Sequence, residues 1–433
     1  MASSFEQLLV ERTKKNDPAV HGVLIKCVGR NGEILYAKTA GYKSLADDAA
    51  PLTPDATLKM GSATKLITSI ALLQCVDDGL LTLDEPISRI LPELANNEII
   101  IAEEQQHQPQ KQHIEAPPNK GFATKQSTKP ITARHLLTHT SGLAYWFLHP
   151  LLIKWKQSGA AGPNGTSQRI VERFKIPLLF EPGEGCFYGP NLDWAGIVVS
   201  RLHSGVSLEE YMIERIWKAV DRTAPFPTFH VSRHHEYEAR LMQSADRAAD
   251  TGNLTHSPGN AFCVGLEEDD EGGAGLTVTM DDYVAVLQDL ICNDNNATAT
   301  RSKLFRNKPR ESLSLLFGPQ FRHGSYAAKG LVQQRSAWDM VAGPVVTEDE
   351  DINHTLGGLL ITGEVPEIGQ PAETLCWGGS PNIVWFANRE RGVAGFFATQ
   401  MSPFGNPAVK ELVNAWKKDF WGQYDGAGGR VGA

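Results

Sequence analysis

A serine and a lysine three residues apart, Ser62 and Lys65, form the only Ser-x-x-Lys pattern in the chain. Residues at this spacing share one face of a helix with Cβ atoms about 5–6 Å apart, so the hydroxyl and the amine can share a hydrogen bond. The residues that follow are largely apolar, and burial there favours a neutral amine that accepts the proton of the hydroxyl. The N-terminus of such a helix also offers backbone N–H groups to an oxyanion. The alternative is a serine that caps the helix and a lysine that extends to solvent.

Histidines offer a second kind of chemistry. His135 and His139 are four residues apart, and His234 and His235 precede Glu236, so a metal-dependent hydrolase is an alternative. The first pair lacks the glutamate directly after the first histidine that serves as base in the zincin pattern. The nucleophile elbow Gly-x-Ser-x-Gly and the dinucleotide pattern Gly-x-Gly-x-x-Gly are absent from the chain. We therefore expect no metal site and no organic cofactor.

Six segments follow one another along the chain in a recognisable order. They are Leu58-Lys-Met-Gly-Ser-Ala-Thr-Lys65, Asp78-Gly-Leu-Leu-Thr-Leu-Asp84, Ile131 to Leu143, Phe187 to Gly196, the glycine-rich turn and helix from Gly272 to Tyr283, and Trp377-Gly-Gly-Ser380. Their order and spacing resemble the serine β-lactamase and penicillin-binding-protein-like family, most closely its class C-like branch of esterases, DD-peptidases and transesterases. The resemblance runs from about residue 20 to residue 420.

This resemblance implies roles for the residues around Ser62. Ser62 would be the nucleophile that forms an acyl-enzyme, and Lys65 with Tyr188 would handle its proton. The backbone N–H groups of Ser62 and Ser380 would hold the oxyanion, because the two glycines before Ser380 leave the reacting carbonyl uncrowded. On local grounds alone, a core tyrosine at 188 and a plain β-bulge at 377–380 are the alternatives.

Two departures from the family pattern bear on the substrate. Pro190 stands where the family has the asparagine of its Tyr-x-Asn element, and Trp377-Gly378 replaces the charged or polar third motif that binds the carboxylate of β-lactams and peptides. These departures disfavour penicillin processing. With them, the Trp377 and Tyr188 segments resemble those of the esterases and of the fungal transesterases of polyketide metabolism. We expect an apolar substrate to be bound by Tyr145, Trp146, Trp194, Trp377, Gly378 and Gly379, with core packing as the alternative for the aromatic residues.

The predicted function is that of a serine acyltransferase, or transesterase. It would move an acyl group from a thioester or ester through acyl-Ser62 to an alcohol of a hydrophobic secondary metabolite. Its partners would be a small-molecule acyl donor and an alcohol acceptor, and whether an acyl carrier protein delivers the acyl chain stays open. A carboxylesterase or weak β-lactamase-type hydrolase is the alternative, and a non-catalytic binding or assembly protein of the same fold is a lesser one. The sequence leaves open the donor, the acceptor and the oligomeric state.

Composition and charge exclude other classes of protein. The 433 residues carry 41 Lys and Arg against 50 Asp and Glu, a net charge of −9, which disfavours nucleic acid as a partner. No apolar run approaches the ~18 to 20 residues that span a bilayer, and the first residues lack the apolar core of a signal peptide. We expect a cytoplasmic protein with no membrane association. The six cysteines have neither disulfide nor zinc spacing, and we expect free, buried thiols.

The elements that position these residues follow from apolar periodicity. A hairpin turns at Asn31-Gly32, and strand-like runs lie at 374–377, 383–388 and 392–399. Helices are predicted over 4–15, from Ser62 to Gly79 as a buried central helix, and over 407–420. Residues 131–250 are mostly of helical periodicity.

The predicted fold class is therefore α/β (α+β), in the β-lactamase/transpeptidase-like arrangement that the resemblance implies. One antiparallel sheet is built from both chain ends and flanked by helices. The sheet domain would contain 1–85 and 255–433. The helical subdomain would contain 86–254, including a polar surface loop near 101–130.

Overall fold

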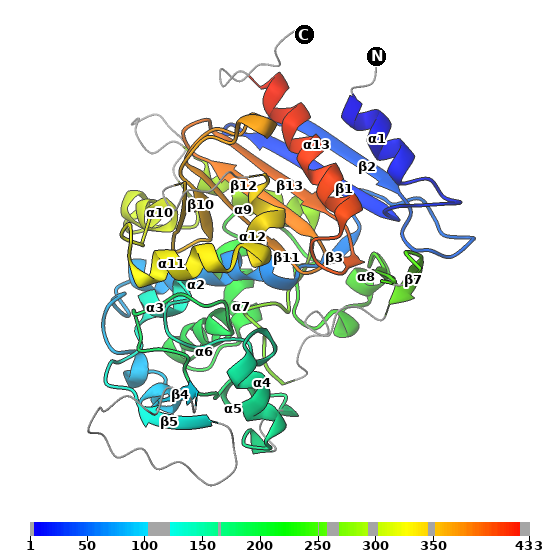
Figure 1. The fold of residues 1–433 in the computed structure, drawn as a ribbon. Helices are drawn as coiled ribbons and strands as arrows, with labels where there is room; N and C mark the ends of the chain where they lie inside the picture. Colours follow the sequence, from blue (N-terminus) through cyan, green and yellow to red (C-terminus); the bar gives the residue numbers. More distant parts are fainter. Residues whose placement is uncertain are drawn as a thin grey trace.

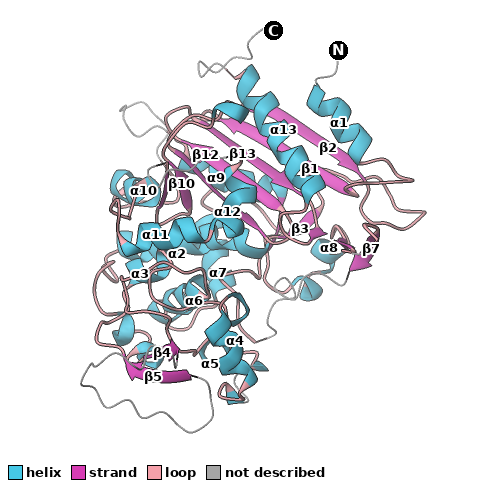
Figure 2. Cartoon of the chain, viewed as in Figure 1, coloured by secondary structure: helices cyan, strands magenta, loops and turns pink. Residues whose placement is uncertain are grey.

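The computed structural model describes residues 4–102, 122–162, 166–249, 251–257, 268–292, 302–344 and 351–424. A seven-stranded antiparallel sheet forms one half of the molecule, and short helices with a small hairpin form the other (Figure 1 and Figure 2). The strand order is β2-β1-β13-β12-β11-β10-β9. In chain order these strands are β1 (Gly22–Gly29), β2 (Ile34–Gly41), β9 (Ile352–His354), β10 (Leu359–Ile361), β11 (Thr374–Gly379), β12 (Ile383–Asn388) and β13 (Val393–Ala398).

The sheet joins the two ends of the chain. β1 and β2 form the hairpin predicted at Asn31-Gly32, and Gly32 has the positive φ of 85° that such a turn favours. β1 then pairs with β13 in antiparallel register, with Leu24 opposite Ala398. The prediction of one antiparallel sheet built from both chain ends is therefore confirmed.

Helices cover both faces of this sheet. α1 (Ser4–Arg12) and α13 (Pro407–Gln423) lie side by side over one face (Figure 1). Because side chains alternate along a strand, consecutive residues of β13 point to opposite faces of the sheet. Phe397 contacts Trp416 of α13 with ring centroids 5.8 Å apart, whereas Phe396 contacts Tyr283 of α9 (Met280–Leu290) at 5.2 Å. Both faces are thus buried, as the continuous apolar runs of β12 and β13 require.

The central helix of the molecule is α2 (Thr64–Asp77), which packs against α6 (Asn191–Leu202). It begins two residues later than predicted, because Gly61–Ala63 forms a separate 3₁₀ turn. Every residue of α2 except Val76 is buried. Gly79, predicted as its stop, has the positive φ of 73° that is common just after a helix.

The second half of the molecule contains the short helices and one hairpin. The prediction of a polar surface loop near 101–130 needs correction at both ends, because residues 101–102 pair with residues 122–123 as strands, with Ile101 opposite Ala123. Residues 103–121 lie outside the described part of the chain. The elements are β4 (Glu98–Ala102), β5 (Phe122–Gln126), α3 (Ala133–Leu137), α4 (Pro150–Gln157), α5 (Ile170–Arg173), α6, and α7 (Leu208–Met212), which continues into a π-helical turn at Ile213–Trp217.

Two further small sheets lie outside the seven-stranded sheet. β3 (Thr57–Lys59), just before the serine turn, pairs with β8 (Thr277–Thr279), and β6 (Ser244–Arg247) pairs with β14 (Met401–Ser402) and β7 (Leu254–Ser257). The subdomain limits at 86 and 254 stay a prediction. The remaining helices are α8 (His235–Glu238), α10 (Pro309–Phe317), α11 (Tyr326–Gln333) and α12 (Arg335–Ala342).

The cysteines of the described ranges are all buried, and Cys27, Cys75, Cys186 and Cys376 are free thiols, as expected. Cys292 is buried as well, whereas Cys263 lies outside those ranges. Within the same ranges, none of the helices combines the length and the apolar character needed to cross a bilayer.

Asp77, at the C-terminal end of α2, provides a test of how this helix is fixed. Its two carboxylate oxygens accept hydrogen bonds from the backbone N–H groups of 306–308 and from the hydroxyl of Ser312. Asp77→Asn replaces one acceptor oxygen with a donor, and we expect the free energy of unfolding to fall by about 2 kcal/mol. Denaturant unfolding measures this, with the exposed Asp47→Asn as control. Equal stability of the two variants would contradict the prediction.

Candidate active site

Ser62 lies in a tight turn between β3 and α2, and Gly61 determines the shape of this turn. Gly61 has a φ of +50°, and a Cβ atom there would lie 2.9 Å from the backbone nitrogen of Ser380 and 2.7 Å from its Oγ. Only glycine fits such a position without moving the chain. On the other side, the hydroxyl of Tyr283 donates to the carbonyl oxygen of Ala63 at 2.8 Å. The serine turn is therefore held against the sheet and α9.

Ser62, Lys65 and Tyr188 lie together in the structure. Tyr188 Oη donates to Ser62 Oγ at 2.5 Å, and Lys65 Nζ lies 3.4 Å from the same oxygen. Lys65 Nζ is also 4.6 Å from the centre of the Tyr188 ring. The contact with Ser62 removes the alternative of a tyrosine that only fills the core. The serine hydroxyl has two groups within reach that can take its proton.

The amine of Lys65 is buried among acceptors. The residue is 4% exposed, and its Nζ donates to the carbonyl oxygen of Gly273 at 2.7 Å and to Tyr145 Oη at 3.2 Å. Burying an amine is costly unless such partners are present. The alternative of a lysine that extends to solvent is therefore wrong. Tyr145, predicted to bind substrate, lines the cleft and is also a partner of Lys65.

Two buried acids that sequence reasoning did not single out lie behind Lys65. Asp193, in the first turn of α6, accepts from the backbone N–H of Gly273 at 2.9 Å and from Tyr145 Oη at 3.5 Å. Burial raises the pKa of Asp193, and the charge of Lys65 acts in the opposite direction. Burial, with the charge of Asp193, raises the pKa of Glu271 to about 8. The signal for Asp193 in the sequence is its place on the Tyr188 segment, five residues beyond the tyrosine.

The end of β11 runs along the serine turn. A Cβ atom at Gly379 would lie 1.9 Å from the carbonyl oxygen of Met60, so the two backbones are in direct contact. The pairing of β11 with β12 is regular through Gly378 and Gly379, so the alternative of a plain β-bulge is wrong. The backbone N–H of Ser380 consequently lies beside the turn that carries Ser62.

An uncharged cleft of about 350 Å³ opens at Ser62. Its walls come from the segment around Tyr145, from α12 and from the end of β11. Sequence reasoning missed α12, whose small side chains belong to no motif. The lining residues are Ser62, Tyr145, Phe147, Leu148, Tyr188, Ala274, Ser336, Ala337, Val341, Trp377, Gly378, Gly379, Ser380 and Phe404.

Two tryptophans predicted to bind substrate do not line this cleft. Trp194 is fully buried, and its Nε1 donates to the carbonyl oxygen of Phe174 at 3.3 Å. Trp146 faces Lys156, whose Nζ lies 4.0 Å from the ring centre. Trp146–Leu148 is a 3₁₀ turn, in which successive side chains point about 120° apart. The two residues after Trp146 reach the cleft in its place.

The polar residues around the Tyr-x-Asn element support the chain instead of lining the cleft. Pro190 precedes α6, and the next residue, Asn191, is fully buried. Its amide contacts Ser141, His139 Nδ1 and the carbonyl oxygen of Leu143. Burial lowers the pKa of His139 well below its usual range, so its ring is neutral beside Tyr188, 4.9 Å away. Among the described residues, no three His, Cys, Asp or Glu side chains are placed to hold a metal ion.

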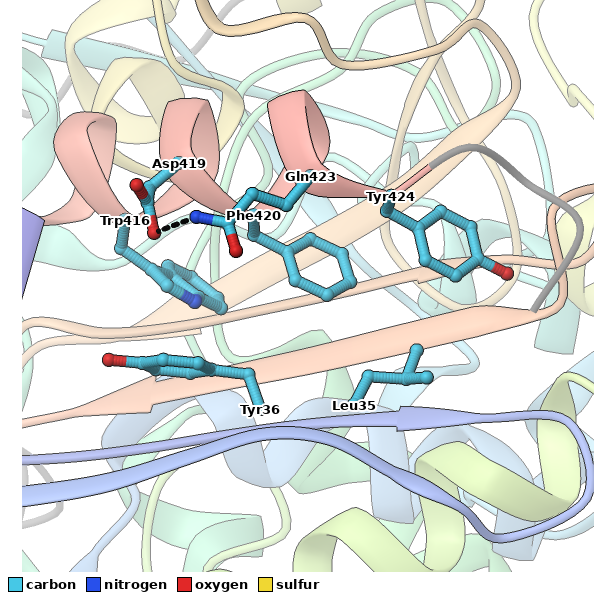
Figure 3. Close-up of a pocket in the computed structure, with 7 residues that line it drawn as sticks. All are labelled: Leu35, Tyr36, Trp416, Asp419, Phe420, Gln423 and Tyr424. Carbon is cyan, nitrogen blue, oxygen red and sulfur yellow. Dashed lines mark hydrogen bonds between the residues drawn. The ribbon is translucent and has the colours of Figure 1, made fainter. Parts of the chain in front are cut away.

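A second, smaller cavity lies between β2 and α13 (Figure 3). Its volume of about 30 Å³ is close to that of a single water molecule. Aromatic rings of Tyr36, Trp416, Phe420 and Tyr424 form most of its lining. It contains neither a serine nor a lysine, so the acyl chemistry of the cleft has no counterpart there.

Comparison with known proteins agrees with this geometry. The beta-lactamase family model matches residues 10–416. The chain is 46% identical to the acyltransferase calJ of Penicillium decumbens, over 98% of both chains, and 32% identical to a lovastatin esterase of Penicillium rubens, over 94% of this chain and 95% of that one.

A solved structure extends the likeness to the whole fold. The unliganded simvastatin synthase LovD of Aspergillus terreus superposes with a TM-score of 0.80 and 27% identity, covering 98% of this chain and 99% of that chain. The predicted β-lactamase/transpeptidase-like fold is confirmed. The chain therefore belongs to the β-lactamase family, as an enzyme of its serine acyltransferase and esterase type.

Proposed function

We propose that this enzyme is a transesterase, in which Ser62 takes an acyl group from a thioester or ester and passes it to an alcohol. The observation that carries the proposal is the position of Ser62 Oγ, 2.5 Å from Tyr188 Oη and 3.4 Å from Lys65 Nζ, in an uncharged cleft. No metal or organic cofactor takes part in this chemistry.

In the acylation step, Ser62 Oγ attacks the carbonyl carbon of the donor, and its one proton is taken up by the Lys65–Tyr188 pair, in which the neutral amine of Lys65 is the base. The tetrahedral intermediate then expels the thiol or alcohol of the donor, which leaves with that proton. Acyl-Ser62 remains. In the second step the acceptor alcohol gives its proton to the same pair and attacks the acyl carbon, and Ser62 recovers a proton as it leaves.

The oxyanion of each tetrahedral intermediate would be bound by the backbone N–H groups of Ser62 and Ser380. Two features support this assignment: the close approach of Gly61 to Ser380, and the absence of side chains at Gly378 and Gly379. Fixed N–H donors of this kind stabilise the charge that develops in the transition state.

The lining of the cleft supports apolar substrates. None of its residues carries a charge that would bind the carboxylate of a β-lactam or peptide, and Trp377 stands close to Tyr188, with ring centroids 5.6 Å apart. We propose short or branched acyl thioesters as donors, presented in the cytoplasm on pantetheine, coenzyme A or an acyl carrier protein. The acceptor would be the hydroxyl of a hydrophobic natural product.

A carboxylesterase is the second candidate function, because one relative, at 32% identity, is named a lovastatin esterase. Hydrolysis and transfer share acyl-Ser62 and differ only in whether water or an alcohol receives the acyl group. The lesser alternative is a non-catalytic protein. Such a protein would not need a costly buried amine beside a serine hydroxyl, as Lys65 is beside Ser62.

Ser62 is expected to be the only residue that forms a covalent adduct. Intact-mass measurement after incubation with a fluorophosphonate or p-nitrophenyl ester should show one added group, and none in Ser62→Ala. Ser336→Ala removes another hydroxyl from the cleft lining and should still be labelled. An adduct that persists in Ser62→Ala would show that Ser62 is not the only nucleophile.

Lys65 and Tyr188 are expected to act as one unit, because both contact the same hydroxyl. Lys65→Ala and Tyr188→Phe should each reduce kcat/KM by roughly 10²–10⁴-fold. The double variant should lose little more than the worse single variant, because either change breaks the shared proton path. Losses that multiply in steady-state kinetics would show independent roles.

The choice between transfer and hydrolysis is expected to depend on the acceptor. With a thioester donor, added hydrophobic alcohols should convert the product from free acid to ester, since a shaped apolar cleft binds them in competition with water. Mass spectrometry of the products measures this ratio. If free acid is the sole product at every alcohol concentration, and simple esters or penicillins turn over faster, the enzyme is a hydrolase.

A further inference from the structure

We propose that Asp193 is a positioning residue that aims the amine of Lys65 at Ser62 through two bridges, the hydroxyl of Tyr145 and the peptide groups of Gly273. The proposal rests on the proposed function, because it concerns the proton that Lys65 exchanges with Ser62. Asp193 is 1% exposed and does not line the cleft, so it acts only through its neighbours.

The first bridge is the backbone of Gly273. Its N–H donates to Asp193 Oδ1 at 2.9 Å, and its carbonyl oxygen accepts from Lys65 Nζ at 2.7 Å. A Cβ atom at this position would lie 2.3 Å from Asp193 Oδ2, so only glycine allows the acid to approach this closely. The carboxylate thus fixes the carbonyl that receives one N–H of the amine.

The second bridge is the hydroxyl of Tyr145. Burial raises the pKa of Tyr145 well above its usual range, so the hydroxyl keeps its proton. An ionised carboxylate can only accept hydrogen bonds, and Tyr145 Oη lies 3.5 Å from Asp193 Oδ2 as the donor. The lone pairs of the same oxygen are then directed to Lys65 Nζ, 3.2 Å away.

The two bridges determine where the third position of the amine points. A neutral amine has two N–H groups and one lone pair. When Gly273 and Tyr145 accept the two N–H groups, the lone pair is left for Ser62 Oγ, at 3.4 Å. Asp193, Tyr145, Lys65 and Gly273 therefore form a closed ring whose one free direction is the serine.

The charges around this ring leave the negative charge on Asp193. Glu271, with its pKa raised to about 8, holds its proton at neutral pH, whereas the two hydrogen bonds that Asp193 accepts favour its ionised form. The titratable groups that act on Asp193, Lys65 and their partners are Tyr145, Tyr188, His139, Glu271 and Arg173.

The substitution Asp193→Asn tests the proposal. The new amide oxygen can accept from Gly273, but the new NH₂ donates to Tyr145 Oη, whose proton then turns to Lys65 and occupies its lone pair. We expect kcat/KM to fall roughly 100-fold, mostly through kcat. The acid limb of the pH profile should move to lower pH, because removing a negative charge beside Lys65 favours the neutral amine.

A rescue variant separates positioning from a structural role. Tyr145→Phe in the Asp193→Asn background removes the misdirected proton, so the double variant should be more active than Asp193→Asn. Tyr145→Phe alone should lower kcat with less effect on KM. Asp77→Asn is the matched control, since it changes a buried carboxylate at the far end of α2. It should lose stability and keep its kcat.

The outcomes are distinct. Losses that multiply in the double variant, or an acid limb that stays in place, overturn the role of Asp193. If Asp193→Asn does not fold, Tyr145→Phe decides, because an unchanged kcat there excludes the Tyr145 bridge. Fluorophosphonate labelling of the wild-type enzyme separates the two proposals. Failure to label Ser62 removes the proposed function, whereas normal labelling without the pH shift removes only the positioning role.

Discussion

The burial of one amine, that of Lys65, is the constraint on which the rest of the site depends. Taking an ammonium or amine out of water is affordable only where acceptors surround it. Here the two acceptors, Gly273 and Tyr145, and the third partner, Ser62, come from three different parts of the chain. The sheet half and the helical half must therefore meet at this nitrogen, and a shift of either half disturbs the serine.

The same constraint explains why the cleft can be uncharged. The ionisable groups of the site lie behind Ser62, where Gly273 connects Asp193 to Lys65, and not on the surface that a substrate touches. The wall opposite is the C-terminal end of β11, where Gly378 and Gly379 present backbone in place of side chains. Recognition is then left to shape and apolar contact, which suits an acyl chain better than a peptide carboxylate.

The sequence was sufficient for the parts of the structure that local patterns determine. Asn31-Gly32, the apolar run of α2 and the strand-like apolar runs near residues 374–399 predicted the sheet and its central helix. The directions in which side chains point could not be predicted from these local patterns. Trp146 and Trp194 carry the same ring, yet a 3₁₀ turn directs one to Lys156 and helix α6 buries the other. Helix α12 carries no motif, because the small residues with which it lines the cleft cannot be distinguished in the sequence from small residues elsewhere. Asp193 was within the Tyr188 segment, but its partner Gly273 is distant in sequence, so only folding brings them together.

The pairing of β1 with β13 has a consequence for how the protein is made. β1 lies near the start of the chain and β13 near its end, yet the two are neighbours inside the sheet. During synthesis, the β1–β2 hairpin must wait with an open edge until the residues of β13, more than 350 positions further along, have left the ribosome, and such an edge is a site for wrong pairing. Long-range closure of this kind also folds slowly. A chain cut short before β13 would lose an inner strand of the sheet, and the hairpin would have no partner to join.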